Sequence, residues 1–277
     1  MVGKKRTVGK GICYLFAVFW GIMTIFPLFI TFLSSVKNNE GITLGMFKWP
    51  DAFLWSNYIT AFEKANIGRA VLNSIFVALT STVIVCLVGM LAAYVLTRKK
   101  FKLKGLIYSL FIVGVMVPVH CTIIPISTLG TRTGGMNSYW FLILVYVAFN
   151  LSQAIFLFTG YLNGISREMD EAAIIDGCND TQLLFRILMP MSVPIISTEA
   201  ILAFIYGYGE LIFSMVLLTN EKKYTISRAM LAFSGGYQTQ LGPIFACIIV
   251  AVLPMIILYI LFHERVQSGM LAGAIKG

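Results

Sequence analysis

Charged side chains are scarce in this sequence. Its 277 residues include 21 Lys and Arg and 12 Asp and Glu, so charged residues make up 12% of the chain, whereas 58% of the residues are hydrophobic. A water-soluble domain of this size needs a polar exterior, and so few charges do not provide one. The composition therefore predicts a membrane protein, in agreement with the mean hydropathy of +0.85.

Patterns that bind metals, form disulfides or bind nucleotides are also missing. The five cysteines stand far apart, no Cys-x-x-Cys pair occurs, and there are only two histidines. This spacing predicts no disulfide framework and no metal site. The net charge of +9 comes from short basic clusters between apolar runs, which excludes a basic face for nucleic acid. Because the sequence has no Gly-x-x-x-x-Gly-Lys-Ser/Thr loop, we do not expect the chain to hydrolyse ATP itself.

Six stretches are apolar and long enough to cross a bilayer, which takes about 20 residues per helix. The first stretch follows a basic N-terminus, as a signal peptide does. It is too long for one and lacks a small-x-small cleavage site, so we expect an uncleaved anchor. The sequence thus predicts an all-α, polytopic membrane protein. The six predicted spans are residues 12–33, 71–97, 106–129, 139–160, 193–219 and 244–262.

The distribution of Lys and Arg predicts the orientation of these spans, because cytoplasmic segments carry an excess of basic residues. With the N-terminus inside, 13 of the 21 Lys and Arg fall in cytoplasmic segments, and five of them lie between the second and third spans. We therefore expect both termini in the cytoplasm. The predicted division is a cytoplasmic tail at 1–11, a first anchor at 12–33, an extracytoplasmic loop at 34–70, a core of five spans at 71–262 and a cytoplasmic tail at 263–277.

The connection 161–190 between the fourth and fifth spans is rich in acids. It contains five Asp and Glu against two Arg. Acids have little influence on membrane topology, so insertion does not require this composition. Apolar residues at helical spacing, Ile165, Met169 and Ala172, predict a short amphipathic helix on the cytoplasmic surface.

Two turn signals follow that helix. Gly177 suits the left-handed residue after a helix C-terminus. Asn179, with Gln182 three residues later, predicts the cap of a second helix, which Pro190 then follows. The expected structure is helix, turn, helix. An ordinary interfacial hairpin is the simplest interpretation of this pattern.

The same connection resembles the EAA loop of the permeases of binding-protein-dependent ABC importers. The resemblance rests on Glu171-Ala172-Ala173, Gly177, Ile187, Met189 and Pro190 at their spacing. The family has Leu where Met189 stands. In that family the loop forms the coupling helix that docks in a cleft of the cytoplasmic ATPase. The small residues suit close helix approach, and the acids suit Arg or Lys of a partner.

The resemblance covers nearly the whole chain from about Asn57 onward, and it is to the shorter permease of carbohydrate importers of the maltose-importer type. It is carried by Asn73-Ser74, Leu91-Ala92-Ala93-Tyr94, Met116-Val117-Pro118 and the ending from Gly269 to Gly277.

The resemblance implies the type I permease fold and a transport subunit rather than an enzyme, in the bacterial cytoplasmic membrane. The implied partners are a second homologous permease, an ATPase dimer that binds ATP and Mg, an extracytoplasmic solute-binding protein and a carbohydrate. No cofactor is implied in this chain itself. The implied ATPase contacts are Glu168, Glu171, Ala172, Ala173, Asp176, Gly177, Ile187 and Pro190 in the loop and Gly269, Gly273, Lys276 and Gly277 in the tail. The outer loop residues Gly236, Tyr237 and Gln238 correspond to the binding-protein contact.

The fifth predicted span contains two carboxylates, each of which would cost about 2.5 to 3.5 kcal/mol at the centre of a lipid-facing helix. On one helix, Glu199 and Glu210 would lie about 20° apart around the axis and roughly 16 Å along it, so one face looks toward protein or water. Gly207 and Gly209 are expected to bend the helix. The family typically has Trp-Asn before the acid, whereas Tyr208-Gly209 stands here.

Candidates for the translocation path are polar residues of the fourth and fifth spans. For Glu210 two uses stay open, a hydrogen bond to a sugar hydroxyl or a tie between helices, and the tie is favoured because polar side chains between helices are more often structural. The candidates are Glu210, Tyr206, Asn150 and Gln153.

Two other functions compete with that of a permease for a carbohydrate. An intramembrane enzyme would use Glu199, Glu210 and His120 as acid and base groups, but nothing in their spacing brings the histidine to the acids. The position of His120 between Pro118 and Pro125 instead predicts kinked packing. A permease for a solute other than a sugar shares the coupling loop and stays open.

Overall fold

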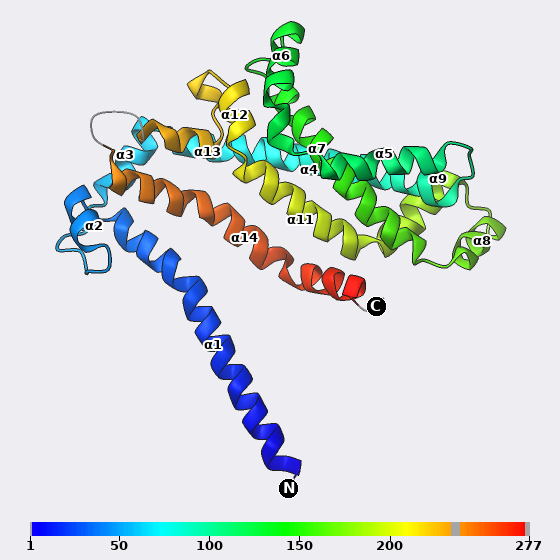
Figure 1. The fold of residues 1–277 in the computed structure, drawn as a ribbon, viewed down its shortest axis with the longest axis horizontal. Coiled ribbons are helices and arrows are strands. Elements are labelled where there is room, and N and C mark those ends of the chain that lie inside the picture. The colour runs from blue at the N-terminus through cyan, green and yellow to red at the C-terminus, as the bar shows by residue number, and fades with distance from the viewer. Residues whose placement is uncertain (1, 234–238, 275–277) are drawn as a thin grey trace. The chain divides into compact units, whose positions relative to one another are not determined.

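The computed structural model describes residues 2–233 and 239–274, and every regular element within these ranges is helical (Figure 1). This confirms the predicted all-α class. The α-helices are α1 (Val2–Ser35), α2 (Asn39–Gly45), α3 (Ser56–Lys64), α4 (Ile67–Arg98), α5 (Lys104–Met116), α6 (Ile123–Thr133), α7 (Tyr139–Asn163), α8 (Arg167–Ile175), α9 (Asp180–Gln182), α10 (Met189–Met191), α11 (Val193–Gly209), α12 (Ile212–Leu217), α13 (Ile226–Ala229) and α14 (Leu241–Ala274); the short helices η1 (Val119–Thr122), η3 (Glu221–Lys223) and η4 (Met230–Phe233) are 3₁₀, and η2 (Leu183–Leu188) is a π-helical turn.

Four of the six predicted spans are single helices, since α1, α4, α7 and α14 each contain a stretch long and apolar enough to cross a membrane. Each of the other two spans consists of two helical segments with a sharp bend between them. Residues 104–116 and 119–133 meet at 96°, and residues 180–191 and 193–209 meet at 77°. The predicted number of six spans is therefore reached when each bent pair counts as one span.

The third predicted span is not a straight helix, and proline explains why. Helix α5 ends at Met116, and Val117 and Pro118 adopt extended conformations with ψ angles of 122° and 110°. A proline disfavours the helical conformation of the residue before it and cannot donate a backbone hydrogen bond. His120 follows at this bend and stacks on Phe213, with ring centroids 6.5 Å apart, so the predicted kinked packing is confirmed.

The fifth predicted span also ends earlier than residue 219. Helix α11 stops at Gly209, Glu210 is extended with a ψ of 126°, and the short helix α12 follows. A bend near the two glycines was predicted, and the break lies directly after the second of them. The carboxylate of Glu210 stabilises the new helix start, as described below.

The described residues form two compact units. Unit 1 comprises Met1–Gly68 and Met230–Pro254, and unit 2 comprises Arg69–Ala229 and Met255–Gly277, each as far as it is described. In unit 1, the side chain of Asn57 ties α3 to the end of α1 by donating to the carbonyls of Ser35 and Lys37, at 2.9 Å each. The ammonium of Lys37 donates to the carbonyls of Gly45 (3.1 Å) and Met46 (3.0 Å) and so closes the loop after α2.

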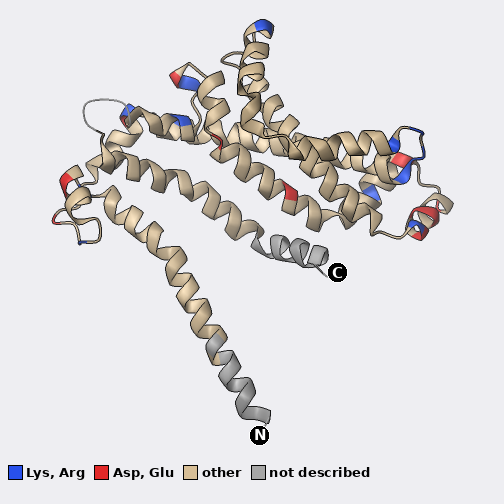
Figure 2. Cartoon of the chain, viewed as in Figure 1, with Lys and Arg blue, Asp and Glu red and all other residues tan. Residues whose placement is uncertain are grey.

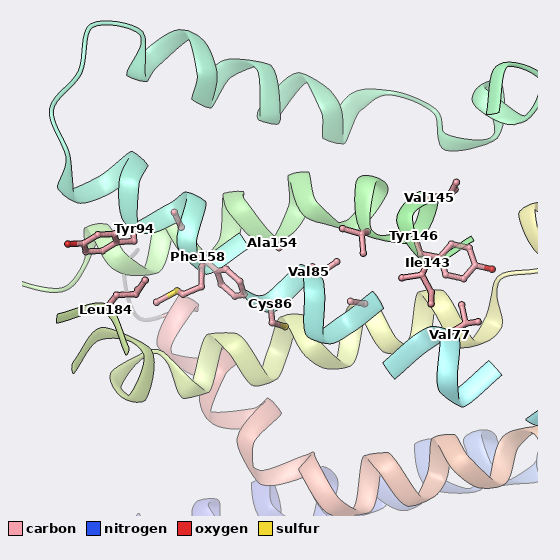
Figure 3. Packing of buried hydrophobic residues seen from close by; sticks show 14 of the residues in the cluster. Val77, Val85, Cys86, Tyr94, Ile143, Val145, Tyr146, Ala154, Phe158 and Leu184 are labelled. Atoms are coloured by element: carbon pink, nitrogen blue, oxygen red, sulfur yellow. The ribbon is translucent and has the colours of Figure 1, made fainter. Parts of the chain in front are cut away.

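The core of unit 2 is built around α7, which packs against α5 and α11. Phe158 and Ala154 of α7 lie beside Val85 and Cys86 of α4 (Figure 3). Helices α4 and α11 come close at Gly207, where a Cβ would stand only 3.3 Å from the Cα of Ala78. Small residues at helix interfaces allow this kind of approach in membrane proteins, and α4, α7 and α11 all contribute buried apolar side chains to this core.

Candidate functional site

The acid-rich connection 161–190 folds as the predicted helix, turn, helix at one end of unit 2 (Figure 1). Its first helix, α8, begins after Ser166, whose hydroxyl accepts the N–H of Glu168 at 3.3 Å. The helix ends at a turn in which Gly177 has a φ of +85° and donates its N–H to Ile174. Because this conformation favours glycine, the predicted left-handed role of Gly177 is confirmed.

The second helix begins at the predicted cap. The side chain of Asn179 accepts the N–H of Gln182, and the side chain of Gln182 accepts the N–H of Asn179, at 2.8 and 2.9 Å. The prediction that Pro190 follows the helix was wrong, since the helix continues through Pro190 to Met191. The π-helical turn before it carries a hydrogen bond from Met189 to Leu184, and its wider backbone accommodates a proline that lacks an N–H.

The faces of α8 differ from the predicted ones. The helix starts at Arg167, and its buried residues are Asp170 and Ala173 rather than Met169 and Ala172. The outward face is partly apolar. Ile175 is 85% exposed and Ile174 is 58% exposed, so this helix presents apolar side chains away from unit 2.

Two of the five acids, Asp170 and Asp180, are paired within the chain, and neither was among the predicted ATPase contacts. The carboxylate of Asp170 lies 2.6 Å from the Nε of Arg98, and both side chains are nearly buried. Asp180 accepts from Lys99 at 2.6 Å and from the hydroxyl of Tyr94 at 3.0 Å. Glu168, Glu171 and Asp176, by contrast, are exposed.

Burial raises the pKa of the Asp170 carboxyl, and the charges of Arg98 and Arg167 oppose that rise. Removing an ion pair from water costs free energy that the attraction between its charges regains only in part. We therefore interpret the contact between Asp170 and Arg98 mainly as a constraint on the position of α8. Figure 2 shows Lys and Arg (blue) and Asp and Glu (red) close together at the end of unit 2 that carries α8 and α9.

Arg98, Lys99 and Tyr94 also belong to the site, although they were not predicted as members of it. Arg98 and Lys99 were counted among the basic residues that set topology. A signal was nonetheless present, because a basic cluster and an acidic connection were predicted on the same side of the membrane. Which residues pair across the intervening span could not be read from local patterns.

The other residues of the loop fall into two groups. Ala173 packs in the core of unit 2, and Ile187 is half-buried and packs against that core. Ala172 and Pro190 are exposed. The loop therefore has an inward side that holds it to unit 2 and an outward side that is open to a partner.

Glu210 occupies the break in the fifth span and is 8% exposed. Its carboxylate accepts the N–H groups of Phe213 (2.8 Å) and Ser214 (3.1 Å), the second and third residues of α12. It also accepts the hydroxyl of Tyr146 on α7 at 2.7 Å. The geometry is that of a helix cap and a tie between helices.

The remaining candidates for the translocation path lie between helices of unit 2. Gln153 donates to Glu199 at 3.3 Å, which joins α7 to α11, and Glu199 is fully buried. Asn150 donates to the carbonyl of Tyr146 on its own helix at 2.8 Å. The ring of Tyr206 meets the ring of Tyr146 edge on, with centroids 5.9 Å apart.

Several predicted contact residues are not part of this geometry. Gly236, Tyr237, Gln238, Lys276 and Gly277 lie outside the described residues, and Gly269 and Gly273 fall within the last part of α14.

The sequence and the fold both match known transport proteins. Residues 85–271 match the family model described as the binding-protein-dependent transport system inner membrane component. The chain is 30% identical to the diacetylchitobiose uptake system permease protein of Streptomyces coelicolor, covering 96% of this chain and 88% of that protein. It is 27% identical to the melibiose/raffinose/stachyose import permease protein of Bacillus subtilis, covering 98% of this chain and 99% of that protein.

A solved structure shares the fold. It is a chain of a bacterial ABC transporter involved in the import of the acidic polysaccharide alginate, and it superposes with a TM-score of 0.77 at 21% identity over 95% of this chain and 97% of that one. With the family match, this likeness confirms the predicted permease fold and a transport subunit rather than an enzyme. The chain therefore belongs to the family of inner membrane components of binding-protein-dependent transport systems.

Proposed function

We propose that this chain is the permease subunit of an ATP-driven importer of a carbohydrate, coupled to its ATPase through the loop 161–190. The observation that carries the proposal is the docking face on the loop, defined as the exposed side chains of Met169, Ala172, Ile174 and Ile175 on α8. Exposed apolar side chains on a short rigid helix favour insertion into a complementary cleft. The relatives named above support a saccharide as the solute, because their names refer to saccharides.

The proposed complex follows from the family. It contains a second homologous permease, two copies of an ATPase that hold ATP and Mg, and an extracytoplasmic solute-binding protein. Both termini of the chain and the coupling loop lie in the cytoplasm, as the basic clusters favour. The exposed carboxylates Glu168, Glu171 and Asp176 surround the docking face and suit basic side chains of the ATPase.

Within the membrane, we assign Glu210 to the structure of the permease rather than to the solute. Its carboxylate already accepts three hydrogen bonds within unit 2 and is 8% exposed, so at most one of its about four acceptor sites is left for a sugar hydroxyl. We extend this assignment to Asn150 and Gln153, whose amides donate within the chain, and leave Tyr206 as the candidate that borders the path. Selection of the solute then rests largely on the partner chains.

The class of solute is tested by transport. The complete complex, with its own binding protein, is reconstituted in vesicles that contain ATP, and uptake of radiolabelled oligosaccharides is compared with uptake of amino acids and inorganic anions. We expect ATP-dependent uptake of a saccharide alone. Uptake of an amino acid or an anion instead would show that the proposed class of solute is wrong, although the chain would still belong to the same family.

The docking face is tested by Ile175→Glu. This residue is 85% exposed, so the substitution leaves the core of unit 2 untouched and places a charge in the proposed ATPase contact. We expect affinity for the ATPase to fall about tenfold or more, as for a central contact residue, in titrations of the permease pair with purified ATPase. The matched control is Leu103→Glu, which alters a 59% exposed residue between α4 and α5. An equal loss for both variants would argue against a specific docking face.

A further inference from the structure

The segment after α1 folds back along that helix, and Figure 1 shows α2 and its loop beside the last turns of α1. The ring of Phe47 stacks on the ring of Phe26 in α1, with centroids 6.0 Å apart. Phe26 lies nine residues before the end of α1, which is about 13 Å along the helix axis. At the far end of the segment, Leu54 donates its N–H to the carbonyl of Val36 at 2.8 Å. Residues 37–53 therefore form a closed loop, which we call the return loop.

The tip of the return loop lies at the depth of a membrane span. The span within α1 covers Cys13–Ser35, about 34 Å of helix, which matches a hydrocarbon core of about 30 Å. The level of Phe26 is then well inside the bilayer. A shift of the span that brought Phe26 to the membrane surface would draw Lys10 into the hydrocarbon core, because crossing it takes about 20 residues. The side chain of Phe47, which is 73% exposed, is therefore at the level of the acyl chains.

Lys37 satisfies the backbone of the return loop from within. Non-helical backbone at membrane depth is tolerated only where its polar groups have partners in the protein. The ammonium of Lys37, a residue that is 4% exposed, donates to the carbonyls of Gly45, Met46 and Lys48. The large side chains that the loop exposes are apolar, namely Leu44, Phe47 and Trp49. The loop therefore has the surface and the internal bonds that a position in one leaflet requires.

The return loop lines a cavity of about 410 Å³, a volume in the range of small-molecule sites. Two basic and two acidic side chains line it, so that the charges of the lining cancel: Lys37, Lys48, Glu40 and Asp51. The charge of Lys37 is bound by backbone carbonyls. Among the described side chains, Lys48, Glu40 and Asp51 form no ion pair. One cation and two anions of the lining are therefore open to a ligand.

These groups fit a zwitterion that joins a phosphate to an ammonium. Lys48 suits the phosphate, and its stem packs over Gly45, where a Cβ would stand 2.8 Å from the Cδ of Lys48. Glu40 and Asp51 suit the ammonium. Trp49 also lines the cavity, and the face of an indole ring attracts the same cation. A purely anionic ligand would be repelled by the two carboxylates, so the lining favours the headgroup of a zwitterionic phospholipid.

A row of aromatic rings marks the headgroup level beside the cavity. Trp49 meets Phe53 edge on, with centroids 6.2 Å apart, and Phe53 stacks on Trp55 at 6.3 Å. The ring of Trp55 lies 5.9 Å from that of Tyr58 in α3. Trp and Tyr gather at membrane–water interfaces, because their rings are apolar and carry a polar group. The row places the cavity where headgroups and acyl chains meet.

We propose that the return loop is inserted in one leaflet of the membrane and that its cavity binds the headgroup of a zwitterionic phospholipid, with Lys48 on the phosphate and Glu40 and Asp51 on the ammonium. The acyl chains of the lipid then lie against the exposed side chains of the loop tip. A free solute with the same headgroup lacks these chains and loses that part of the binding. The inference does not depend on which solute the transporter carries.

The test measures lipid binding to the purified complex by native mass spectrometry, with phosphatidylethanolamine and phosphatidylglycerol of equal acyl chains as probes. We expect Lys48→Gln to weaken binding of phosphatidylethanolamine about tenfold, the scale of one hydrogen bond to a charged group. Glu40→Gln combined with Asp51→Asn leaves only basic charge in the lining, and should shift the preference toward phosphatidylglycerol. The matched controls are Lys64→Gln and Glu63→Gln on α3, which alter exposed residues outside the cavity and should bind both lipids as the wild type does.

The shifted preference separates a specific effect from misfolding, since a misfolded chain would lose both lipids. Equal binding by the wild type, the cavity variants and the α3 variants would overturn the headgroup site. Binding of soluble glycerophosphoethanolamine as tight as that of the lipid would also overturn it and assign the cavity to a free solute. Displacement of the lipid by an oligosaccharide would assign the cavity to a saccharide instead.

A second measurement tests the depth of the loop without these variants. A nitroxide label is placed at Phe47→Cys, in a chain whose five native cysteines are replaced, and the complex is reconstituted in vesicles. We expect lipid-soluble oxygen to relax this label more than a water-soluble nickel chelate does. The reference is a label at Ile25→Cys, beside Phe26 in α1 and 65% exposed, which should show the same order. Stronger relaxation of the Phe47→Cys label by the nickel chelate would overturn insertion of the loop.

Discussion

Replacing Gly177 by proline is expected to abolish transport while membrane insertion continues. Proline fixes φ near −65° and lacks an N–H, whereas Gly177 has a φ of +85° and donates its N–H to Ile174 at 3.0 Å. The turn between α8 and α9 therefore cannot form, and the docking face is no longer presented. Uptake into vesicles should fall to background. The yield of the chain in the membrane fraction should match the wild type, because the six spans are unchanged.

Two further substitutions separate the conformation of this turn from general damage. Gly177→Ala keeps the N–H but puts a side chain in the left-handed region, at about 1 to 2 kcal/mol, and should reduce transport only in part. Gly134→Ala carries the same strain, at a φ of +70° with no atom near its Cβ, in the connection between α6 and α7. Transport by Gly134→Ala should remain near wild type. Normal transport by Gly177→Pro would remove the loop from the coupling mechanism.

Replacing Glu210 by alanine is expected to cause the largest loss of stability. The carboxylate accepts bonds from Tyr146, Phe213 and Ser214, and a buried donor that loses its partner keeps its full desolvation penalty. Inside a membrane no water takes the place of the missing acceptor. We expect a loss on the order of 3 kcal/mol, seen as a lower midpoint of thermal unfolding in detergent.

Milder substitutions decide between structure and solute recognition at this position. Tyr146→Phe removes one bond and should cost about 1 kcal/mol, and Glu210→Gln keeps an acceptor and should lie between the two. If stability explains the role of Glu210, transport should decline in the same order as stability. Loss of transport in Glu210→Gln with a wild-type unfolding midpoint would instead show that the carboxylate meets the solute.

Local patterns were sufficient for much of the fold. Spans such as α4 and α7 are long apolar runs, which length and composition reveal directly. The coupling hairpin could be predicted because its turn uses Gly177 and its second helix uses the Asn179 and Gln182 cap. Each of these signals depends on residues within a few positions of one another.

The contacts that position the hairpin could not be predicted in this way. Arg98 and Asp170 are 72 residues apart in sequence and meet only because α4 and α7 pack side by side. The inward face of α8 was misassigned for the same reason, since a buried ion pair replaced the apolar contact that periodicity suggests. The bend after α5 was visible as Pro118, but its angle of 96° depends on the packing of His120 and the helices around it.

The π-helical turn before Pro190 sets the rotation of the residues directly after it about the helix axis. In a π turn the bond from Met189 to Leu184 spans five residues rather than four, so the chain carries one residue beyond a regular helical count. One residue corresponds to a rotation of about 100° about the helix axis. A chain without that extra residue would turn Pro190 by about 100° relative to Leu183 and so remove it from the exposed position that it occupies here.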